Sequence, residues 1–215
     1  MKHALVLAAL LTATALPAFA SNDQPVRVVE LFTSQGCSSC PPANKMVVEL
    51  VEDAPDTLAL SYGVTYWDYL GWKDTFGDPA FTERQRSYGK SLPSQVYTPQ
   101  VVVNGEVHAP RWKRRKIDAH VLDVSTLSLG ADGRLSGELP HGTALALVRY
   151  TPGTQDVAVK RGENHGRTMR LANVVTGIDY AVWNGPMSVD VGDGALAVLA
   201  HDDTGRVIAA ARIEP

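Results

Sequence analysis

One stretch of sequence decides the fold, and it runs Val29-Glu30-Leu31-Phe32-Thr33-Ser34-Gln35-Gly36-Cys37-Ser38-Ser39-Cys40-Pro41-Pro42. It overlaps an apolar run typical of a buried strand, Val26 to Phe32, and leads into an amphipathic run typical of a helix, Ala43 to Asp53. Two thiols at a strand-to-helix turn can open and close a disulfide without rearranging the fold. A loop this short stabilises a fold by only about 2 kcal/mol. We therefore interpret Cys37 and Cys40, the only cysteines in the chain, as a redox pair rather than a structural bridge.

The order of the two cysteines predicts their roles. Only a thiolate attacks a disulfide, and a helix N-terminus favours the thiolate through its free backbone N–H groups and its dipole. Cys37 ends the loop after the first strand, so it is the predicted nucleophile. Cys40 lies one turn inward and is the predicted resolving thiol. Pro41 and Pro42 lack N–H groups, so the regular helix is expected to begin near Pro41 and to lower the pKa of Cys37 less.

Two further residues are candidates for the site. Glu30 interrupts an apolar strand, and a carboxylate beneath the thiols could take the proton of Cys40, with its pKa raised by burial. The alternative is a glutamate that faces solvent from one side of the strand. Pro99 follows Tyr97-Thr98 and precedes an apolar strand, which suits a cis-proline turn. The alternative for Pro99 is an ordinary trans proline at a strand start.

The first twenty residues have the pattern of a secretory signal peptide. Lys2 and His3 precede an apolar core, Ala4 to Leu16, and Ala18-Phe19-Ala20 supplies a cleavage pattern of small residues. The apolar run is too short to span a bilayer, so we expect a soluble periplasmic or secreted protein without a transmembrane segment. Removal of Lys2 leaves 19 basic against 23 acidic residues, a charge of −4. This balance argues against nucleic-acid binding.

The pattern of the chain changes near residue 120. Before it, strand-like apolar runs alternate with helix-like runs, and Asn104-Gly105 is typical of a hairpin turn. This order predicts an α/β layer with mixed strand directions. After it, short alternating runs with glycine turns predict a small antiparallel β-sandwich-like domain. These runs are Val124 to Leu129, Arg134 to Leu139, Ala144 to Tyr150, Val157 to Lys160, Met169 to Ile178, Ala195 to Ala200 and Val207 to Ile213.

Several stretches together resemble a known family. Beside the opening stretch, they are Tyr66-Trp67-Asp68-Tyr69-Leu70-Gly71-Trp72-Lys73-Asp74, Arg84-Gln85-Arg86, Tyr97-Thr98-Pro99-Gln100, Arg161-Gly162-Glu163-Asn164 and Gly166-Arg167-Thr168. The chain resembles the secreted bacterial family known as domain of unknown function 1223, within the thioredoxin-like superfamily. The resemblance implies a thioredoxin-like mixed sheet with flanking helices over residues 21–118 and a β-rich domain over 119–215, after the signal peptide at 1–20. It also implies a cis Pro99 that faces the thiols. The chain departs from many members at Gly63-Val64-Thr65, where they carry His-Val-Asp.

Aromatic residues gather in the loop from Tyr66 to Phe76. With Thr98, we expect Trp67, Asp68 and Trp72 to form a substrate-binding surface beside the thiols; the alternative is a lid packed on its own domain. The loop from Gly162 to Gly166, which holds Glu163, Asn164 and His165, is interpreted as a polar turn.

These features predict an exported thiol–disulfide oxidoreductase that acts on protein thiols or disulfides and needs no cofactor. One alternative is a module that binds or delivers Cu(I) or zinc through the same two sulfurs, with His108 as a further ligand. Another is a secreted interaction protein whose disulfide only rigidifies a loop. The sequence specifies neither the direction of the redox reaction nor the oligomeric state.

Overall fold

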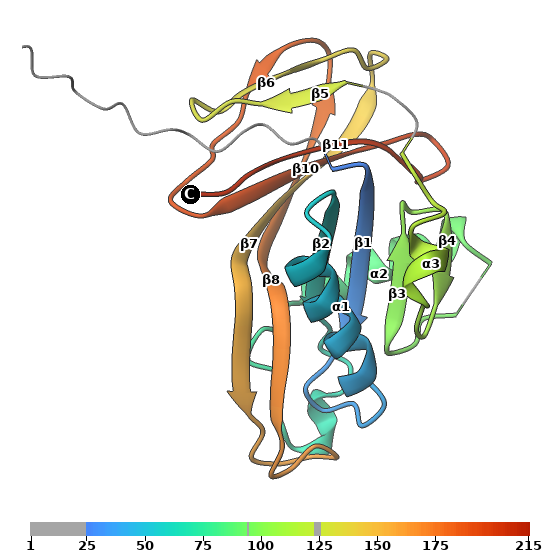
Figure 1. Cartoon of the computed structure of the whole chain (residues 1–215), viewed down its shortest axis with the longest axis vertical. Coiled ribbons are helices and arrows are strands. Elements are labelled where there is room, and N and C mark those ends of the chain that lie inside the picture. The colour runs from blue at the N-terminus through green and yellow to red at the C-terminus, as the bar shows by residue number, and fades with distance from the viewer. Residues whose placement is uncertain (1–24, 94, 123–125) are drawn as a thin grey trace, which may run out of the picture.

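Strand β1 (Arg27–Thr33) lies at the centre of the computed structural model, which describes residues 25–93, 95–122 and 126–215 (Figure 1). All seven residues of β1 are buried. The strand pairs in parallel with β2 (Thr57–Gly63) and antiparallel with β3 (Gln100–Val103). The expected signal peptide lies outside the described residues, so its cleavage stays a prediction.

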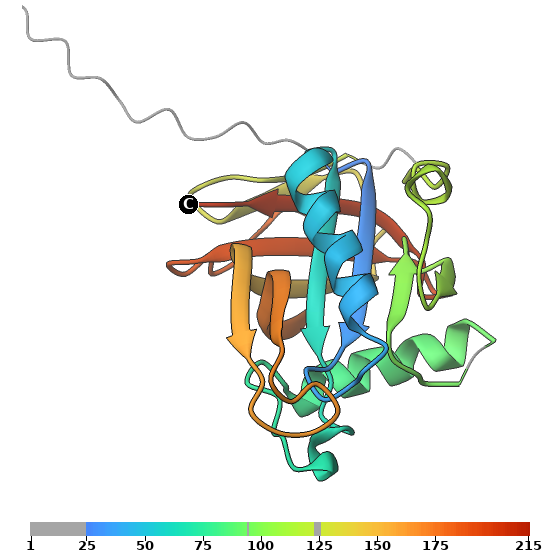
Figure 2. The same cartoon turned by 60° about the horizontal axis from the view of Figure 1, so that its bottom comes forward.

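Helices α1 (Pro41–Asp53) and α2 (Pro79–Ser91) pack on opposite faces of these strands (Figure 2). Side chains alternate along β1. Val29 and Leu31 therefore pack with α1, whereas Val28 and Phe32 pack with α2. Helix α2 begins at Pro79, where the side chain of Asp78 caps it by accepting a hydrogen bond from the backbone N–H of Ala80 at 2.7 Å.

A hairpin and two short helices complete this half of the chain. The predicted turn at Asn104-Gly105 is confirmed: both residues have positive φ angles, 50° and 63°, and they join β3 to β4 (Val107–Ala109). The other elements are the 3-10 helix η1 (Asp68–Leu70) and α3 (Arg114–Ile117).

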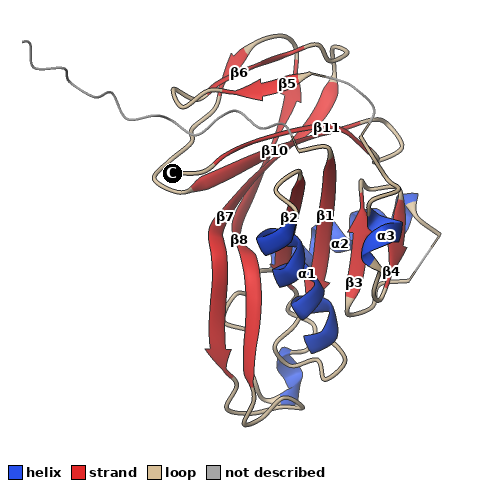
Figure 3. Ribbon diagram, viewed as in Figure 1, coloured by secondary structure: helices blue, strands red, loops and turns tan. Residues whose placement is uncertain are grey.

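Strands dominate the second half of the chain (Figure 3). They are β5 (Leu127–Leu129), β6 (Arg134–Gly137), β7 (Thr143–Ala158), β8 (Thr168–Trp183), β9 (Met187–Ser188), β10 (Ala195–His201) and β11 (Val207–Ile213). One mixed sheet of eight strands runs in the order β11-β10-β7-β8-β2-β1-β3-β4. A sheet of three strands, β5-β6-β9, packs its leucines against residues of β10 and β11. The α/β prediction is thus confirmed as a large mixed sheet with few helices, and that sheet crosses the expected boundary between the two domains.

The long hairpin of β7 and β8 links the two halves. The first part of β7, up to Tyr150, pairs with β10. Val174 of β8 pairs with Ser61 of β2. The sequence predicted two separate strands, Ala144 to Tyr150 and Val157 to Lys160, where β7 is one. Between them the pairing has an irregular step from Thr151 to Thr154, where Gly153 has a φ of 75°.

Candidate active site

Cys37 and Cys40 lie between the end of β1 and the start of α1. Both are free thiols, and their side chains are hydrogen-bonded to each other. Helix α1 begins at Pro41, as expected, and Cys40 caps it: its carbonyl accepts from the backbone N–H groups of Ala43 at 3.0 Å and Asn44 at 3.1 Å. Cys37 and Cys40 are only 1% and 0% exposed, so the thiols are covered in this state of the protein.

The two thiols have opposite pKa shifts. A hydrogen bond from Cys40 does most to lower the pKa of Cys37; burial opposes it, and hydrogen bonds with Ser39 and Thr98 help bring the pKa to about 6. Burial raises the pKa of Cys40, and the neighbouring Cys37 raises it further. The Ser39 hydroxyl lies 3.2 Å from the Cys37 sulfur. At neutral pH the pair therefore holds a thiolate at Cys37 and a thiol at Cys40, in line with the predicted roles.

The turn at Thr98-Pro99 faces this loop. The Thr98–Pro99 peptide bond is cis, which confirms the predicted isomer. The Ser39 hydroxyl donates to the carbonyl of Thr98 at 3.4 Å. The Thr98 hydroxyl in turn accepts a hydrogen bond of 2.6 Å from the indole of Trp67. Thr98 thus connects residues 34–40, which we call the thiol loop, to residues 66–76, which we call the aromatic loop.

The aromatic loop is tied closely to the thiol loop. Trp67, Trp72 and Phe76 are partly buried against the cluster that contains both cysteines. The indole of Trp72 donates to the side-chain carbonyl of Gln35 at 2.8 Å. Asp68, predicted to bind substrate, accepts from the backbone N–H of Asp74 at 3.0 Å. These contacts favour the alternative of a packed lid, while substrate binding by Trp67, Asp68 and Trp72 stays a prediction.

Two residues that hold the thiol loop were missed by the sequence interpretation of this region. Asp74 is buried, and its carboxylate accepts from the backbone N–H of Gln35 at 2.7 Å and of Phe76 at 2.9 Å. Gln35, also buried, donates through its side-chain amide to the hydroxyl of Thr75 at 2.8 Å. Both residues lie in stretches that carry the family resemblance, but nothing in the sequence alone assigns them this role.

A second missed group comes from the tip of the β7–β8 hairpin. The side-chain amide of Asn164 donates to the carbonyls of Gln35 at 3.0 Å and Cys37 at 2.8 Å. The carboxylate of Glu163 accepts from the backbone N–H of Ser38 at 3.0 Å. The loop interpreted as a polar turn is therefore bonded to the thiol loop. The sequence did contain one indication of this role, because Glu163 and Asn164 belong to a stretch that resembles the family. No role was assigned to that stretch.

Glu30 is the main correction to the predicted site. It follows Val29, which packs on α1, so its own side chain enters the α2 face of the sheet. There it forms a bidentate ion pair with Arg84, at 2.6 and 2.9 Å, and accepts a hydrogen bond from the hydroxyl of Tyr88. Burial raises the pKa of Glu30, but the charge and hydrogen bonds of Arg84 outweigh it, so the pKa lies below its ordinary value. The expected raised pKa is wrong, because Arg84 neutralises this carboxylate.

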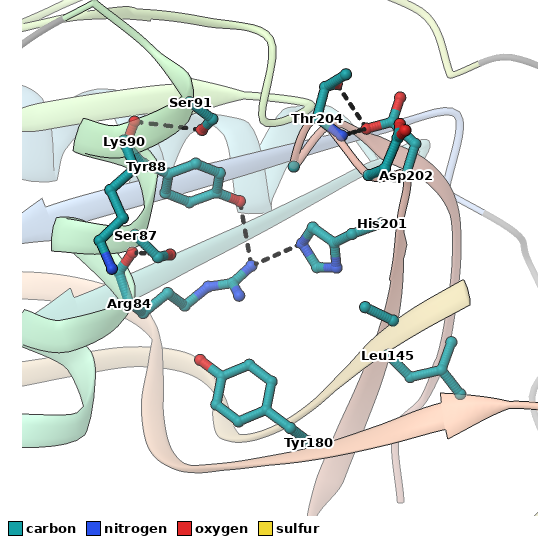
Figure 4. Close-up of a pocket in the computed structure, with 13 residues that line it drawn as sticks. Arg84, Ser87, Tyr88, Lys90, Ser91, Leu145, Tyr180, His201, Asp202 and Thr204 are labelled. Carbon is teal, nitrogen blue, oxygen red and sulfur yellow. Dashed lines mark hydrogen bonds between the residues drawn. The ribbon is translucent and has the colours of Figure 1, made fainter. Parts of the chain in front are cut away.

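Glu30, Arg84 and Tyr88 form a group that we call the Glu30 cluster. It borders a cavity of about 580 Å3 between α2 and the turn from β10 to β11 (Figure 4). Arg84 also contacts the hydroxyl of Tyr88 at 3.2 Å and Nε2 of His201 at 3.3 Å. Burial, followed by the charge of Arg84, lowers the pKa of His201 to about 4. His201 is thus neutral at physiological pH, and the charge of Arg84 is balanced by Glu30.

Among the described residues, the predicted metal alternative finds no third ligand. Across the described ranges, no three His, Cys, Asp or Glu side chains gather closely enough to hold a metal ion. His108, the suggested ligand, bonds instead through Nδ1 to the hydroxyl of Tyr97 at 2.8 Å. Among the residues that the structure describes, no helix is long and apolar enough to cross a membrane.

Comparison with known proteins places this site in a family. The family model described as "Protein of unknown function (DUF1223)" matches residues 28–209. The crystal structure of protein AGR_C_4864 from Agrobacterium tumefaciens is 31% identical, with 90% of this chain and 96% of that chain covered and a TM-score of 0.71. HBP35 of Porphyromonas gingivalis shares the fold at 13% identity, with 89% and 75% covered and a TM-score of 0.59. A search of curated proteins found no match. The chain therefore belongs to the DUF1223 family.

Proposed function

We propose that this protein is an exported thiol–disulfide oxidoreductase with a thioredoxin-like core, in which Cys37 is the nucleophile and Cys40 the resolving thiol. One observation carries the proposal: two adjacent thiols with opposite pKa shifts lie beside the cis Thr98–Pro99 turn. A structural cysteine pair has no need of a thiolate at neutral pH, whereas attack on a disulfide requires one.

The surrounding fold supports a thioredoxin-like core. Strand β1 is parallel to β2 and antiparallel to β3, which pairs in turn with β4. Helix α1 packs on one face and α2 on the other. The thiols precede α1, and the cis proline precedes β3. The export proposal rests on the signal-peptide pattern of residues 1–20.

The proposed reaction consists of two balanced exchanges. The Cys37 thiolate attacks a partner disulfide, forms a mixed disulfide and releases one partner thiolate. Cys40 then attacks the Cys37 sulfur, forms the Cys37–Cys40 disulfide and releases the second partner sulfur. The proton of Cys40 passes to a departing thiolate, so no buried carboxylate is needed. The partner disulfide is reduced to two thiols while the protein dithiol is oxidised, and the reverse sequence oxidises a partner dithiol.

The experiment that tests this function traps the mixed disulfide. Cys40→Ser protein, expressed with its signal peptide, should accumulate covalent partners through Cys37 because the resolving thiol is absent. Alkylation during lysis, non-reducing gels and mass analysis would identify them. The matched control is the Cys37→Ser, Cys40→Ser double variant, which should trap nothing. If the Cys40→Ser protein carries no more partner than this control, the oxidoreductase proposal fails.

A further inference from the structure

The tip of the β7–β8 hairpin, residues 159–167, closes over the thiol loop. We call this segment the arm tip. It provides Asn164, which is 0% exposed and donates to the carbonyls of Gln35 at 3.0 Å and Cys37 at 2.8 Å. It also provides Glu163, which accepts from the backbone N–H of Ser38 at 3.0 Å. Three backbone groups of the thiol loop are thus bonded to two side chains from the second half of the chain.

The arm tip holds these side chains in place with its own hydrogen bonds. Gly166 N–H donates to the carbonyl of Val159 at 2.9 Å, and Arg167 N–H to that of Asn164 at 3.0 Å. The Arg167 guanidinium donates to the side-chain carbonyl of Asn164 at 3.1 Å. Both ends of the Asn164 amide are therefore bonded, which fixes its N–H groups toward the thiol loop.

Apolar packing closes the same contact. Val159 belongs to the buried cluster that contains Cys37 and Cys40. Gly162 faces the aromatic loop, and a Cβ atom added to it would lie 3.5 Å from that of Trp72. With Cys37 only 1% exposed, a disulfide cannot reach its sulfur in this arrangement. Some segment has to move before the proposed exchange can begin.

Among the described strands, the outer part of β7 that leads into the arm tip is paired on one side only, whereas the adjoining part of β8 is buried beside the cysteines through Met169 and Leu171. Strand β7 pairs with β10 only up to Tyr150. Beyond it, the pairing described for residues Thr151 to Ala158 is with β8 alone. The register also shifts between Thr151 and Thr154, around Gly153 with its positive φ of 75°. A strand paired on one side, with an irregularity at its base, opens locally at lower cost than the central strands.

We propose that the arm tip controls access to Cys37, with Asn164 and Glu163 as positioning residues that hold the thiol loop closed. Opening of the tip breaks the bonds to Gln35, Ser38 and Cys37 and uncovers the sulfur for a partner. This inference rests on the proposed function and adds to it the control of its nucleophile.

Alkylation of Cys37 tests the inference without a protein partner. Reduced wild-type protein would be treated with iodoacetamide at pH 8, where Cys37 is a thiolate and Cys40 a thiol, and modification of Cys37 would be followed by peptide mass mapping, so that the rate reports access. Asn164→Ala removes two donors to the thiol loop and should raise the rate constant roughly tenfold. Glu163→Ala should raise it severalfold, and Glu163→Gln, which retains an oxygen acceptor for Ser38, should raise it less. The matched control is His165→Ala, at an exposed position of the tip, which should react like the parent.

Amide hydrogen exchange separates opening of the tip from general loosening. In Asn164→Ala protein, exchange at Ser38 should accelerate, while Ala43 and Asn44, bonded to the carbonyl of Cys40, stay protected. The proposal is overturned if neither Asn164→Ala nor Glu163→Ala reacts faster than His165→Ala. Equal acceleration at Ser38, Ala43 and Asn44 also overturns it. Neither readout uses a partner disulfide, so a failure here is distinct from a failure to trap mixed disulfides.

Discussion

Strand β1 connects two buried clusters. It contributes the carboxylate of Glu30 to the first, and it leads into the second, which contains the thiols of Cys37 and Cys40. In the Glu30 cluster, a carboxylate and the Arg84 guanidinium meet in a bidentate pair, with side chains only 1% and 3% exposed. In the thiol cluster, hydrogen bonds from Cys40, Ser39 and Thr98 stabilise a thiolate, and no cation is among the leading contributions to its pKa. Both clusters are buried, yet only one contains a group suited to attack.

The difference lies in how each negative charge is balanced. A bidentate guanidinium occupies both oxygens of Glu30 and lowers its basicity, so this carboxylate is a poor proton acceptor. Neutral donors stabilise the Cys37 thiolate and leave its sulfur without a fixed counter-charge. Burial of an ionisable group is therefore a weak indicator of reactivity, and the type of partner is the better one.

The largest expected effect is the loss of stability on replacing Arg84. Arg84→Met leaves Glu30 buried without its cation, which should lower the free energy of unfolding by about 3–5 kcal/mol. Arg86→Met is the matched control on α2, because Arg86 forms an exposed ion pair with Glu83; it should cost less than about 1 kcal/mol. Urea unfolding of the two reduced variants would measure both values. Similar values for the two would show that the Glu30 cluster does not stabilise the fold as argued.

The sequence predicted the parts of both clusters that depend on local pattern. The strand, the Cys37–Cys40 turn and the helix start at Pro41 lie within one short stretch. They depend on neighbours along the chain, which is the information that periodicity and turn residues carry. The cis Thr98–Pro99 bond was implied by the family resemblance, because the Tyr97-Thr98-Pro99 turn alone left cis and trans open.

Patterns among neighbouring residues do not predict contacts between distant segments of the chain. Glu163 lies 125 residues from Ser38, and Asn164 lies 127 residues from Cys37. The alternation of β1 indicates that Glu30 and Val29 face opposite sides, but it does not say which side α1 covers. The sequence predicted two strands in place of the long β7, and only its pairing with β8 shows that the strand continues.

A smaller effect should appear in the pH dependence of stability. The folded pKa of Cys37, about 6, lies below the ordinary value of 9.0. The thiolate therefore contributes stability that is fully present above the ordinary pKa and is lost as the pH falls through about 6. Under reducing conditions, the stability of the protein relative to Cys37→Ser should rise between pH 6 and pH 8 by about 1 kcal/mol, after a discount for solvent screening. The raised pKa of Cys40 keeps it a thiol in this range.

Urea unfolding at the two pH values, with reductant present, would measure this difference. The Cys37→Ser variant supplies the baseline, since it retains every other titrating group. A flat difference between pH 6 and pH 8 would mean that Cys37 has an ordinary pKa in the folded protein. The contrast between a reactive thiol cluster and an inert carboxylate cluster would then be lost.

The smallest effect should come from the hydrogen bond between Trp67 and Thr98. Trp67→Phe keeps an aromatic ring but removes the indole donor, whose 2.6 Å bond fixes the Thr98 hydroxyl. Since Thr98 helps to lower the pKa of Cys37, the thiolate fraction at pH 6 should fall about twofold, and the free energy of unfolding by about 0.5 kcal/mol. Absorbance at 240 nm against pH would measure the thiolate. Trp112→Phe is the matched control, because its indole donates to the carbonyl of Val101, at 3.2 Å, away from the thiols. An equal change in both variants would remove Thr98 from the account of Cys37 reactivity and leave Cys40 and Ser39 as the groups that stabilise the thiolate.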